Sequence, residues 1–280
     1  MTETMRIALV GCGKMGEAAL AGWISSSKAP ADALSPSSFA VVAPHAEHRE
    51  ALCDAYGVEA VARVADLAQL GPFDMIVLAV KPQVMPDVLD EVADAFGGAL
   101  PLVVTIAAGI PAARYESALG DAAHVVRVMP NMPLQVGMGA TVVAAGARAS
   151  QDEVGLVNDL FDALGTSHVV PECQIDAVGA ISGSGPAYVA YMVEALRDAG
   201  AAAGIDAQLA ESLALETVGG TYAAMKEKGA TPEEMRISVC SPKGTTLAAL
   251  AAMDEAGFKP LFASGVNAAI RRSEELGGNA

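Results

Sequence analysis

The sequence has few aromatic side chains and few positive charges. Aromatic residues make up 4% of its 280 residues, whereas hydrophobic residues make up 52%, and alanine and glycine are abundant. Small apolar side chains suit closely packed helices better than an aromatic-rich β-sandwich, so we expect an α/β or mostly α protein. Lysine and arginine number 17 against 33 aspartates and glutamates, a net charge of −16. This charge repels nucleic acid and anionic membrane surfaces, so we expect neither as a partner.

Metal-binding, signal and membrane-spanning patterns are also lacking. The N-terminal residues Met1–Thr4 lead directly into an apolar run without a basic region or signal core, which favours a cytoplasmic protein. The uncharged stretch Val128–Ala147 contains prolines, Asn131 and glycines, which indicates loop and strand and not a membrane span. With few histidines and no Cys-x-x-Cys pair, we expect no metal site. We expect free thiols at Cys12, Cys53, Cys173 and Cys240.

Through the first half of the chain, short apolar runs alternate with alanine-rich stretches of helical length. This alternation predicts a Rossmann-type, doubly wound and mostly parallel sheet with helices on both faces. A capping box of Ser150 and Glu153 predicts one more helix, which ends before Gly165. The expected strands are Arg6–Val10, Phe39–Val42, Met75–Val80, Leu102–Ile106, Val125–Met129 and Thr141–Ala144.

A glycine-rich segment, GCGKMG at residues 11–16, follows the first expected strand and opens a helix expected over Glu17–Ile24. In this position the pattern predicts a dinucleotide site, with a glycine-rich turn that binds nothing as the alternative. Gly11 allows the turn, Gly13 lets a pyrophosphate approach the backbone, and Gly16 lets the helix pack on the strand. The first helical N–H groups, near Lys14 and Met15, would then face the anion. Cys12 is expected to be a small side chain and not a nucleophile.

No carboxylate follows the second expected strand. An NAD site usually has Asp or Glu there for the ribose 2′-hydroxyl, whereas this chain has Ala43, Pro44 and His45. Arg49 follows, with His48 beside it. A missing acid and a nearby cation favour a 2′-phosphate and therefore NADP. NAD remains the alternative, with Arg49 then a solvated helix residue.

Beyond Pro171 the β-branched runs disappear and a helical Ala/Leu/Met pattern takes over. We therefore predict a dinucleotide-binding domain over residues 1–168 and an all-α domain over residues 169–280. Its alanine-rich faces suit close helix packing, including packing across a subunit interface. Helices are expected to begin near Pro186, Asp206, Thr231–Pro232, Thr245 and Lys259.

Four segments, in this order, resemble the pyrroline-5-carboxylate reductase family: GCGKMG at 11–16, AVKP at 79–82, RVMPNMP at 127–133 and SPKGTT at 241–246. Residues 105–110 and 182–188 resemble two further stretches, so the resemblance spans nearly the whole chain. It implies NAD(P)H-dependent reduction of L-1-pyrroline-5-carboxylate to L-proline, the last step of proline biosynthesis. It also implies a homodimer through the helical domain, with a decamer as a further assembly.

The resemblance places the cofactor against the turns that follow the strands, with Met129 to Asn131 beside the nicotinamide. These residues come after apolar runs, and open α/β sheets bind ligands at the carboxyl ends of their strands. Besides the glycine-rich segment and Arg49, the residues so implied are Ala79, Val80, Lys81, Pro82, Ala107, Ala108, Gly109, Met129 and Asn131.

The SPKGTT segment is the expected substrate loop. Ser241 and Pro242 turn the chain, Gly244 tightens it, and Thr245–Thr246 opens a helix whose free N–H groups can hold a carboxylate. The resemblance implies that Ser241 and the backbone of Gly244, Thr245 and Thr246 bind the substrate. It makes Thr246 the catalytic residue, with its hydroxyl at the ring nitrogen. Without the resemblance, an ordinary Thr-capped helix is the alternative.

Four positions depart from the family pattern. Lys243 replaces the first glycine of SPGGTT, Cys240 replaces a common Thr, and Ile237 replaces a common Asp. Arg63–Asp66 stands where the family commonly has an Asn near the adenosine ribose. Lys243 either adds a cation near the carboxylate or, if its backbone does not need a positive φ, points to solvent.

Two other kinds of function remain as alternatives. A related two-domain dehydrogenase or imine reductase would act on another small carboxylate, and a hydroxy acid would require a general base, often a helical lysine. The available lysines, Lys226, Lys228 and Lys259, lie in polar or helix-end contexts that indicate surface positions. A dinucleotide-binding regulator without catalysis would leave the AVKP, MPN and SPKGTT segments unexplained.

Overall fold

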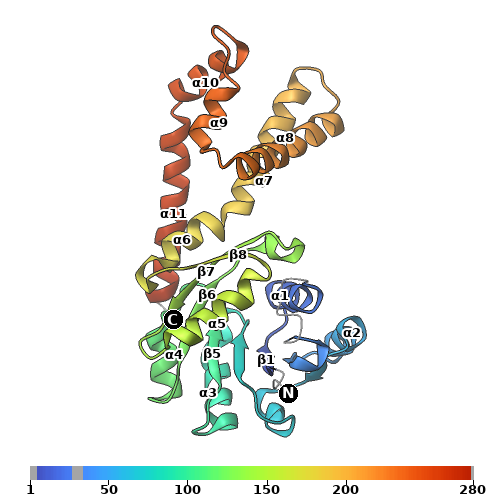
Figure 1. Ribbon diagram of the computed structural model, residues 1–280, viewed down its shortest axis with the longest axis vertical. Helices are drawn as coiled ribbons and strands as arrows, with labels where there is room; N and C mark the ends of the chain where they lie inside the picture. Colours follow the sequence, from blue (N-terminus) through green and yellow to red (C-terminus); the bar gives the residue numbers. More distant parts are fainter. Residues whose placement is uncertain (1–4, 27–33, 279–280) are drawn as a thin grey trace. The chain divides into compact units, whose positions relative to one another are not determined.

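The computed structural model describes residues 5–26 and 34–278, so the expectation made from Met1–Thr4 lies outside the described residues. Eight strands form one sheet in the order β3-β2-β1-β4-β5-β6-β7-β8 (Figure 1). All neighbouring strands are parallel except β6 and β7, which are antiparallel. The predicted doubly wound, mostly parallel sheet is therefore confirmed. The strands are β1 (Ile7–Val10), β2 (Phe39–Val42), β3 (Glu59–Val61), β4 (Met75–Leu78), β5 (Leu102–Thr105), β6 (Val125–Met129), β7 (Gly139–Ala145) and β8 (Gly165–Val169).

Both faces of the sheet are covered because alternate residues of a strand point to opposite sides. Ile7 and Leu9 of β1 belong to one buried cluster, and Ala8 and Val10 belong to another. Helices α1 (Lys14–Ser25), α2 (Ala46–Tyr56) and α5 (Gln151–Asp162) cover the first face. Helices α3 (Met85–Phe96) and α4 (Ala112–Leu119) cover the second.

Trp23 of α1 is the largest fully buried side chain on the first face. Its ring stacks on Phe39 and meets Phe161 edge to face, with centroid distances of 5.9 and 5.3 Å. Its Nε1–H donates a 2.9 Å hydrogen bond to the carbonyl of Leu160. This contact fixes α1, and with it the glycine-rich segment, against β2 and α5.

Short 3₁₀ turns connect the strands and helices at the sheet's ends. They are η1 (Pro36–Ser38), η2 (Val64–Gln69), η3 (Pro82–Val84), η4 (Met132–Val136) and η5 (Glu172–Gln174). The helices that follow the sheet are α6 (Ile175–Ser182), α7 (Gly185–Ala202), α8 (Ala207–Lys228), α9 (Pro232–Ser238), α10 (Thr245–Glu255) and α11 (Phe258–Gly278). The starts expected for α7 to α11 agree with the structure to within a residue or so. The capping box predicted at Ser150 is formed, and Thr231 and Glu234 form a second one at the start of α9.

The chain divides into two compact units. Met1–Ser184 with Ala269–Ala280 forms the sheet unit, and Gly185–Ala268 forms the helical unit. The boundary predicted at residue 168 lies inside β8, and the structure places α6 with the sheet. The reason is apolar packing, because Ile175 of α6 is buried against Val142 and Ala144 of β7.

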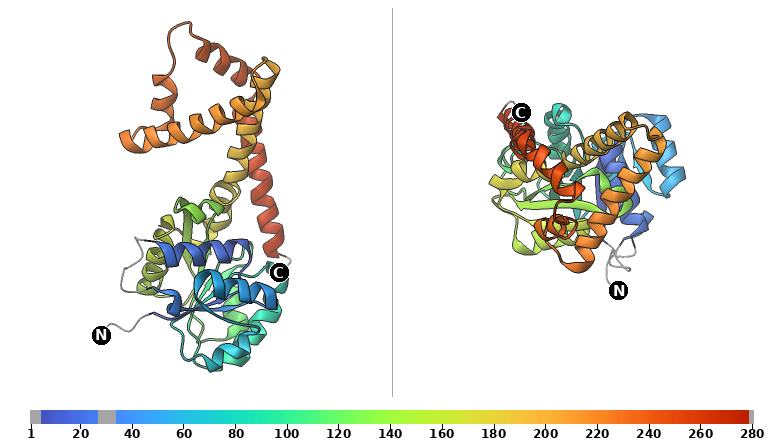
Figure 2. Two further views of the ribbon diagram at one scale, coloured as in Figure 1. Left: turned by 90° about the vertical axis from the view of Figure 1, so that its right-hand side faces the viewer. Right: turned by 90° about the horizontal axis from the view of Figure 1, so that it is seen from above.

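The helical unit has almost no core of its own. Among its described residues, only Val193, Ala210 and Ala214 are buried. Helices α7 and α8 pack closely at Gly200, where a Cβ would lie 2.9 Å from that of Ala210. Figure 2 shows the helices of this unit spread apart and not gathered into a closed bundle. No described helix is both long and apolar enough to cross a bilayer.

Candidate active site

The glycine-rich segment forms a tight turn between β1 and α1. Gly11 has a φ of +86°, and a Cβ there would lie 2.5 Å from Cγ1 of Val80. A Cβ at Gly16 would lie 2.6 Å from the carbonyl oxygen of Gly11. At Gly13, in contrast, a Cβ would meet nothing within 4 Å. Two glycines therefore let the turn close, and the third leaves its backbone open to a ligand such as a pyrophosphate.

The N-terminus of α1 has no side-chain cap. Gly13 is the N-cap residue, and its carbonyl accepts the first helical hydrogen bond from Glu17, at 2.8 Å. The N–H groups of the first turn, which includes Lys14 and Met15, are thus available to an anion. The Cys12 side chain is buried, and burial followed by the charge of Glu17 raises its pKa to about 12. Such a thiol stays protonated near neutral pH, which agrees with its expected role as a small side chain.

The first turn of α2 is tied to two neighbouring segments. Arg49 donates hydrogen bonds from Nη1 to the carbonyl oxygens of Ala43 and Pro44, at 2.8 and 2.7 Å. Nε2 of His48 lies 2.7 Å from the carbonyl oxygen of Cys12. Sequence reasoning took Arg49 as a cation near the ribose, with His48 beside it, but it did not find the contact between His48 and the glycine-rich segment.

The turns after β4 and β5 lie at the same edge of the sheet as the glycine-rich segment, because β1, β4 and β5 are adjacent and parallel. Ala79 donates its N–H to the carbonyl of Val10 at 2.8 Å. Val80 is half-buried, Lys81 is exposed, and Pro82 begins η3.

After β5, the turn of residues 107–109 is held by a hydrogen bond to the last residue of the strand. The N–H of Ala107 donates to Oγ1 of Thr105 at 3.3 Å, and Gly109 has a φ of +80°. Ala107 is buried, and Ala108 is half-buried beside it. The structure thus brings the predicted cofactor residues of three turns to one edge of the sheet. This edge includes the point at β1 where the order of the strands in the sheet changes direction.

Met129 and Asn131, at the end of β6, are packed against α6. The Asn131 side chain is 6% exposed, donates from Nδ2 to the carbonyl of Ser182 at 2.9 Å, and accepts at Oδ1 from the N–H of Ala140 at 2.9 Å. A Cβ at Gly183 would lie 2.8 Å from Cε of Met129. The side-chain amide of Asn131 is therefore engaged inside the protein.

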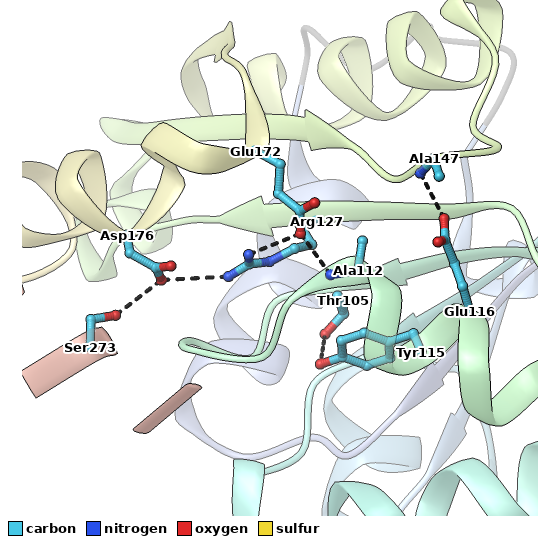
Figure 3. Close-up of polar contacts among 9 residues, drawn as sticks. All are labelled: Thr105, Ala112, Tyr115, Glu116, Arg127, Ala147, Glu172, Asp176 and Ser273. Carbon is cyan, nitrogen blue, oxygen red and sulfur yellow. Dashed lines mark hydrogen bonds and ion pairs between the residues drawn. The ribbon is translucent and has the colours of Figure 1, made fainter. Parts of the chain in front are cut away.

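A buried arginine is the centre of a network that joins β6 to four other elements of the sheet unit (Figure 3). The Arg127 side chain donates to Glu172 at 3.1 Å and to Asp176 at 3.5 Å. Glu172 also accepts the N–H of Ala112 at 2.6 Å, and Asp176 accepts the hydroxyl of Ser273 at 3.0 Å. A buried guanidinium needs such partners. Arg127 lies two residues before Met129, so this network fixes β6, the strand that leads into the Met-Pro-Asn turn.

The SPKGTT segment forms a turn at the start of α10 in the helical unit. Gly244 is the N-cap residue, it donates its N–H to the carbonyl of Ser241 at 2.9 Å, and no side chain caps the helix. The alternative of a Thr-capped helix is thus wrong, because neither Thr245 nor Thr246 is the cap. Ser241 and Thr245 are exposed, and Thr246 is half-buried.

Lys243 has a φ of +60°, and among the described residues it is the one non-glycine residue with a positive φ. The backbone at this position therefore needs the left-handed conformation, which settles the condition left open by the sequence. A non-glycine residue in that conformation costs roughly 1 to 2 kcal/mol. Within the described residues, no group of three or more His, Cys, Asp or Glu side chains is arranged to hold a metal ion.

Two family models match the chain. The model of pyrroline-5-carboxylate reductase dimerisation matches residues 172–276, and that of NADP oxidoreductase, coenzyme F420-dependent, matches residues 6–109. Pyrroline-5-carboxylate reductase of Synechocystis sp. is 39% identical over 275 residues, which cover 98% of this chain and 99% of the relative. The enzyme of that name from Escherichia coli is 34% identical over 271 residues, which cover 97% of this chain and 98% of the relative.

Solved structures agree with these relatives. The pyrroline-5-carboxylate reductase of Coxiella burnetii superposes with a TM-score of 0.88 at 31% identity, covering 98% of this chain and 99% of its own. The pyrroline carboxylate reductase of Plasmodium falciparum with NADP bound has a TM-score of 0.84 at 27% identity, covering 99% of this chain and 100% of its own.

Proposed function

Because this chain belongs to the pyrroline-5-carboxylate reductase family, we propose that it reduces the C=N bond of L-1-pyrroline-5-carboxylate to give L-proline, with NADPH as the preferred hydride donor. The observation that carries the proposal is the glycine-rich turn at the uncapped start of α1. Gly11 and Gly16 let this turn close tightly, and the space beside Gly13 is open to a ligand. These residues fit a dinucleotide pyrophosphate. The match along nearly the whole chain is what favours a reductase over a hydroxy-acid dehydrogenase or a regulator without catalysis.

The proposed cofactor residues have distinct tasks. Gly13 and the first turn of α1 hold the pyrophosphate through backbone N–H groups. The turns Ala79–Pro82 and Ala107–Gly109 border the dinucleotide along the sheet edge, with Met129 and the backbone of Asn131 on the nicotinamide side. When bound, the cofactor supplies a hydride to the imine carbon, and the ring nitrogen gains one proton.

The preference for NADPH rests on the end of β2. Ala43, Pro44 and His45 offer no carboxylate to a ribose 2′-hydroxyl, and Arg49 is anchored there through Nη1. The rest of its guanidinium is left for a 2′-phosphate, which Arg binds well. The relative from Plasmodium falciparum has NADP bound, which supports the same preference.

The proposed substrate residues lie at the start of α10. The N–H groups of Thr245 and Thr246 face the substrate carboxylate, as at other uncapped helix starts, and the backbone of Gly244 and Ser241 border them. The hydroxyl of Thr246 is not used as a cap and is assigned to the ring nitrogen. An imine can be protonated by water, so the main task of the protein is to align the two reactants.

We further propose that the protein is a homodimer through its helical unit. That unit exposes an apolar groove between α7 and α11, lined by Tyr188, Tyr191, Met192, Phe258, Leu261 and Phe262. Tyr191 and Leu261 are 75% and 72% exposed, and a monomer rarely leaves so large an apolar surface in water. The dimerisation family model covers the same helices. Sedimentation of the full chain tests this, and it distinguishes a dimer from a decamer or a monomer.

A cytoplasmic location suits the cysteines, all four of which are free in the structure.

The test of the activity is an absorbance assay at the nicotinamide band with purified protein, NADPH and pyrroline-5-carboxylate. A hydroxy acid with NADP serves as the control for the rival dehydrogenase, and a cyclic imine with a larger ring tests the substrate size. Oxidation of NADPH by pyrroline-5-carboxylate is the expected result, and its absence would overturn the proposal.

A further inference from the structure

One histidine connects the second helix to the glycine-rich segment. Nε2 of His48, in the first turn of α2, lies 2.7 Å from the carbonyl oxygen of Cys12, 36 residues earlier in the chain. A carbonyl oxygen can only accept a hydrogen bond, so Nε2 must carry the hydrogen. The contact therefore fixes the ring as the Nε2–H tautomer whenever the imidazole is neutral.

This hydrogen bond holds a peptide that the backbone leaves free. On one side, the N–H of Gly11 donates to the carbonyl of Val42 at 3.0 Å; on the other, the carbonyl of Gly13 accepts from Glu17 at 2.8 Å. Among the described residues, no backbone N–H donates to the carbonyl of Cys12. His48 is thus the group that fixes the peptide between Cys12 and Gly13.

The orientation of that peptide decides where the N–H of Gly13 points. A trans peptide is planar, and its C=O and N–H point in opposite directions. When the carbonyl of Cys12 turns towards His48, the N–H of Gly13 must turn away from α2. Gly13 is also the residue at which the backbone is open to a ligand, since a Cβ there meets nothing within 4 Å.

We propose that His48 is a positioning residue of the dinucleotide site, which orients the Cys12–Gly13 peptide so that the N–H of Gly13 faces the pyrophosphate. The inference rests on the proposed function of the glycine-rich segment. NADPH and NADH share the pyrophosphate, so His48 supports both cofactors equally. In this it differs from Arg49, which is assigned to the 2′-phosphate alone.

Calorimetric titration of the full-length protein with NADPH and with NADH tests the proposal in three variants. His48→Ala removes the donor, and a lost hydrogen bond of this kind weakens both cofactors by roughly three- to tenfold. His48→Gln places an amide N–H at a similar reach and is expected to restore binding to near the original affinity. His45→Ala is the matched control, because His45 lies on the same turn, makes no side-chain cap bond, and is expected to change neither affinity.

Two measurements without cofactor complete the test. Thermal unfolding of His48→Ala shows whether the variant is folded, and nitrogen NMR of the histidines is expected to show the Nε2–H tautomer at His48. The proposal is overturned if folded His48→Ala binds both cofactors as the original chain does, if His48→Gln fails to rescue, or if the loss is confined to NADPH. If the unmodified chain binds neither cofactor, the proposed function itself fails, and the inference fails with it.

Discussion

Gly16 lies so close to Gly11 that a Cβ at Gly16 would stand 2.6 Å from the carbonyl oxygen of Gly11. The backbone carbonyl of Gly11 cannot move away without distorting the turn, so Gly16→Ala is expected to destabilise the fold. Gly13→Val is expected to leave the unfolding temperature near the original, because its Cβ meets nothing within 4 Å. It is expected to abolish NADPH binding, because its side chain fills the space for the pyrophosphate. Thermal unfolding and NADPH titration of both variants give the comparison. Tight binding by a folded Gly13→Val protein would remove the phosphate assignment.

Arg49→Ala is expected to weaken NADPH by about ten- to a hundredfold, since a charge-assisted hydrogen bond contributes about 1.5 to 3 kcal/mol. NADH, without the 2′-phosphate, should lose little beyond the effect of freeing the carbonyls of Ala43 and Pro44. Arg49→Lys keeps the charge without the planar fork and should fall between the two. The ratio of the two dissociation constants is the measurement. Equal losses for both cofactors would make Arg49 a structural tether of the β2–α2 turn.

Lys243→Gly is expected to stabilise the protein by about 0.5 to 1 kcal/mol. The substitution relieves the left-handed strain at φ +60°, and the greater freedom of glycine in the unfolded chain offsets part of the gain. Lys243→Ala removes the amine but keeps a Cβ, so it separates backbone strain from charge and should give no gain. Urea unfolding of the three proteins measures the effect. An equal gain in Lys243→Ala would mean that the charge, and not the backbone, is the source.

Acid is expected to weaken the start of α5 through Glu153. Burial tends to raise the pKa of this carboxyl, but hydrogen bonds from the backbone and hydroxyl of Ser150 and from His124 outweigh it, and the net pKa is lowered from 4.5. A lowered pKa in the folded state means that the contribution to stability is complete above the unfolded value and is lost as the pH falls through the folded value. The stability difference between the original chain and Glu153→Gln should therefore be constant near neutral pH and shrink as the pH falls below the ordinary value of 4.5. A difference that does not change with pH would show that the charge of Glu153 is not involved.

Local patterns in the sequence predicted most of the sheet and the glycine-rich turn. The strands that the sequence missed, β3 and β8, are short or polar: β3 has three residues, and β8 contains Thr166, Ser167 and His168. Their pairing with neighbours, and not their own hydrophobicity, makes them strands. The glycine spacing, in contrast, is set by clashes within a few residues of chain and by contact with Ala79 and Val80 in the turn after β4, so the motif alone identified it.

The contacts that orient the site join residues far apart in sequence. His48 and Cys12 are 36 residues apart, Arg127 and Glu172 are 45 apart, and Asn131 and Ser182 are 51 apart. No local periodicity signals such pairs. The placement of α6 with the sheet has the same origin, because it depends on Ile175 meeting β7 and not on any break in composition near residue 168.

Thr246→Ala is expected to lower the rate of imine reduction by one to two orders of magnitude and to leave NADPH binding unchanged. A neutral hydrogen bond contributes about 0.5 to 1.5 kcal/mol, with more where it also fixes orientation, and each tenfold in rate corresponds to about 1.4 kcal/mol. Because Gly244 and not Thr246 is the N-cap of α10, the substitution should leave stability nearly unchanged, whereas loss of a capping hydroxyl would cost about 1 kcal/mol. Stability and rate together therefore separate a substrate contact from a structural one.

Two further substitutions at this position sharpen the result. Thr246→Val keeps the volume and β-branching without the hydroxyl and should behave like Thr246→Ala. Thr246→Ser keeps the hydroxyl without the methyl group and should recover most of the rate. Stopped-flow measurement of hydride transfer at saturating NADPH reports the chemical step itself. A loss beyond a thousandfold would exceed what alignment by one neutral hydrogen bond provides and would point to proton transfer by the hydroxyl. If the alanine and valine variants reduced the imine at the original rate, the α10 hydroxyl would have no part in catalysis, and the substrate nitrogen would have to be aligned by another group.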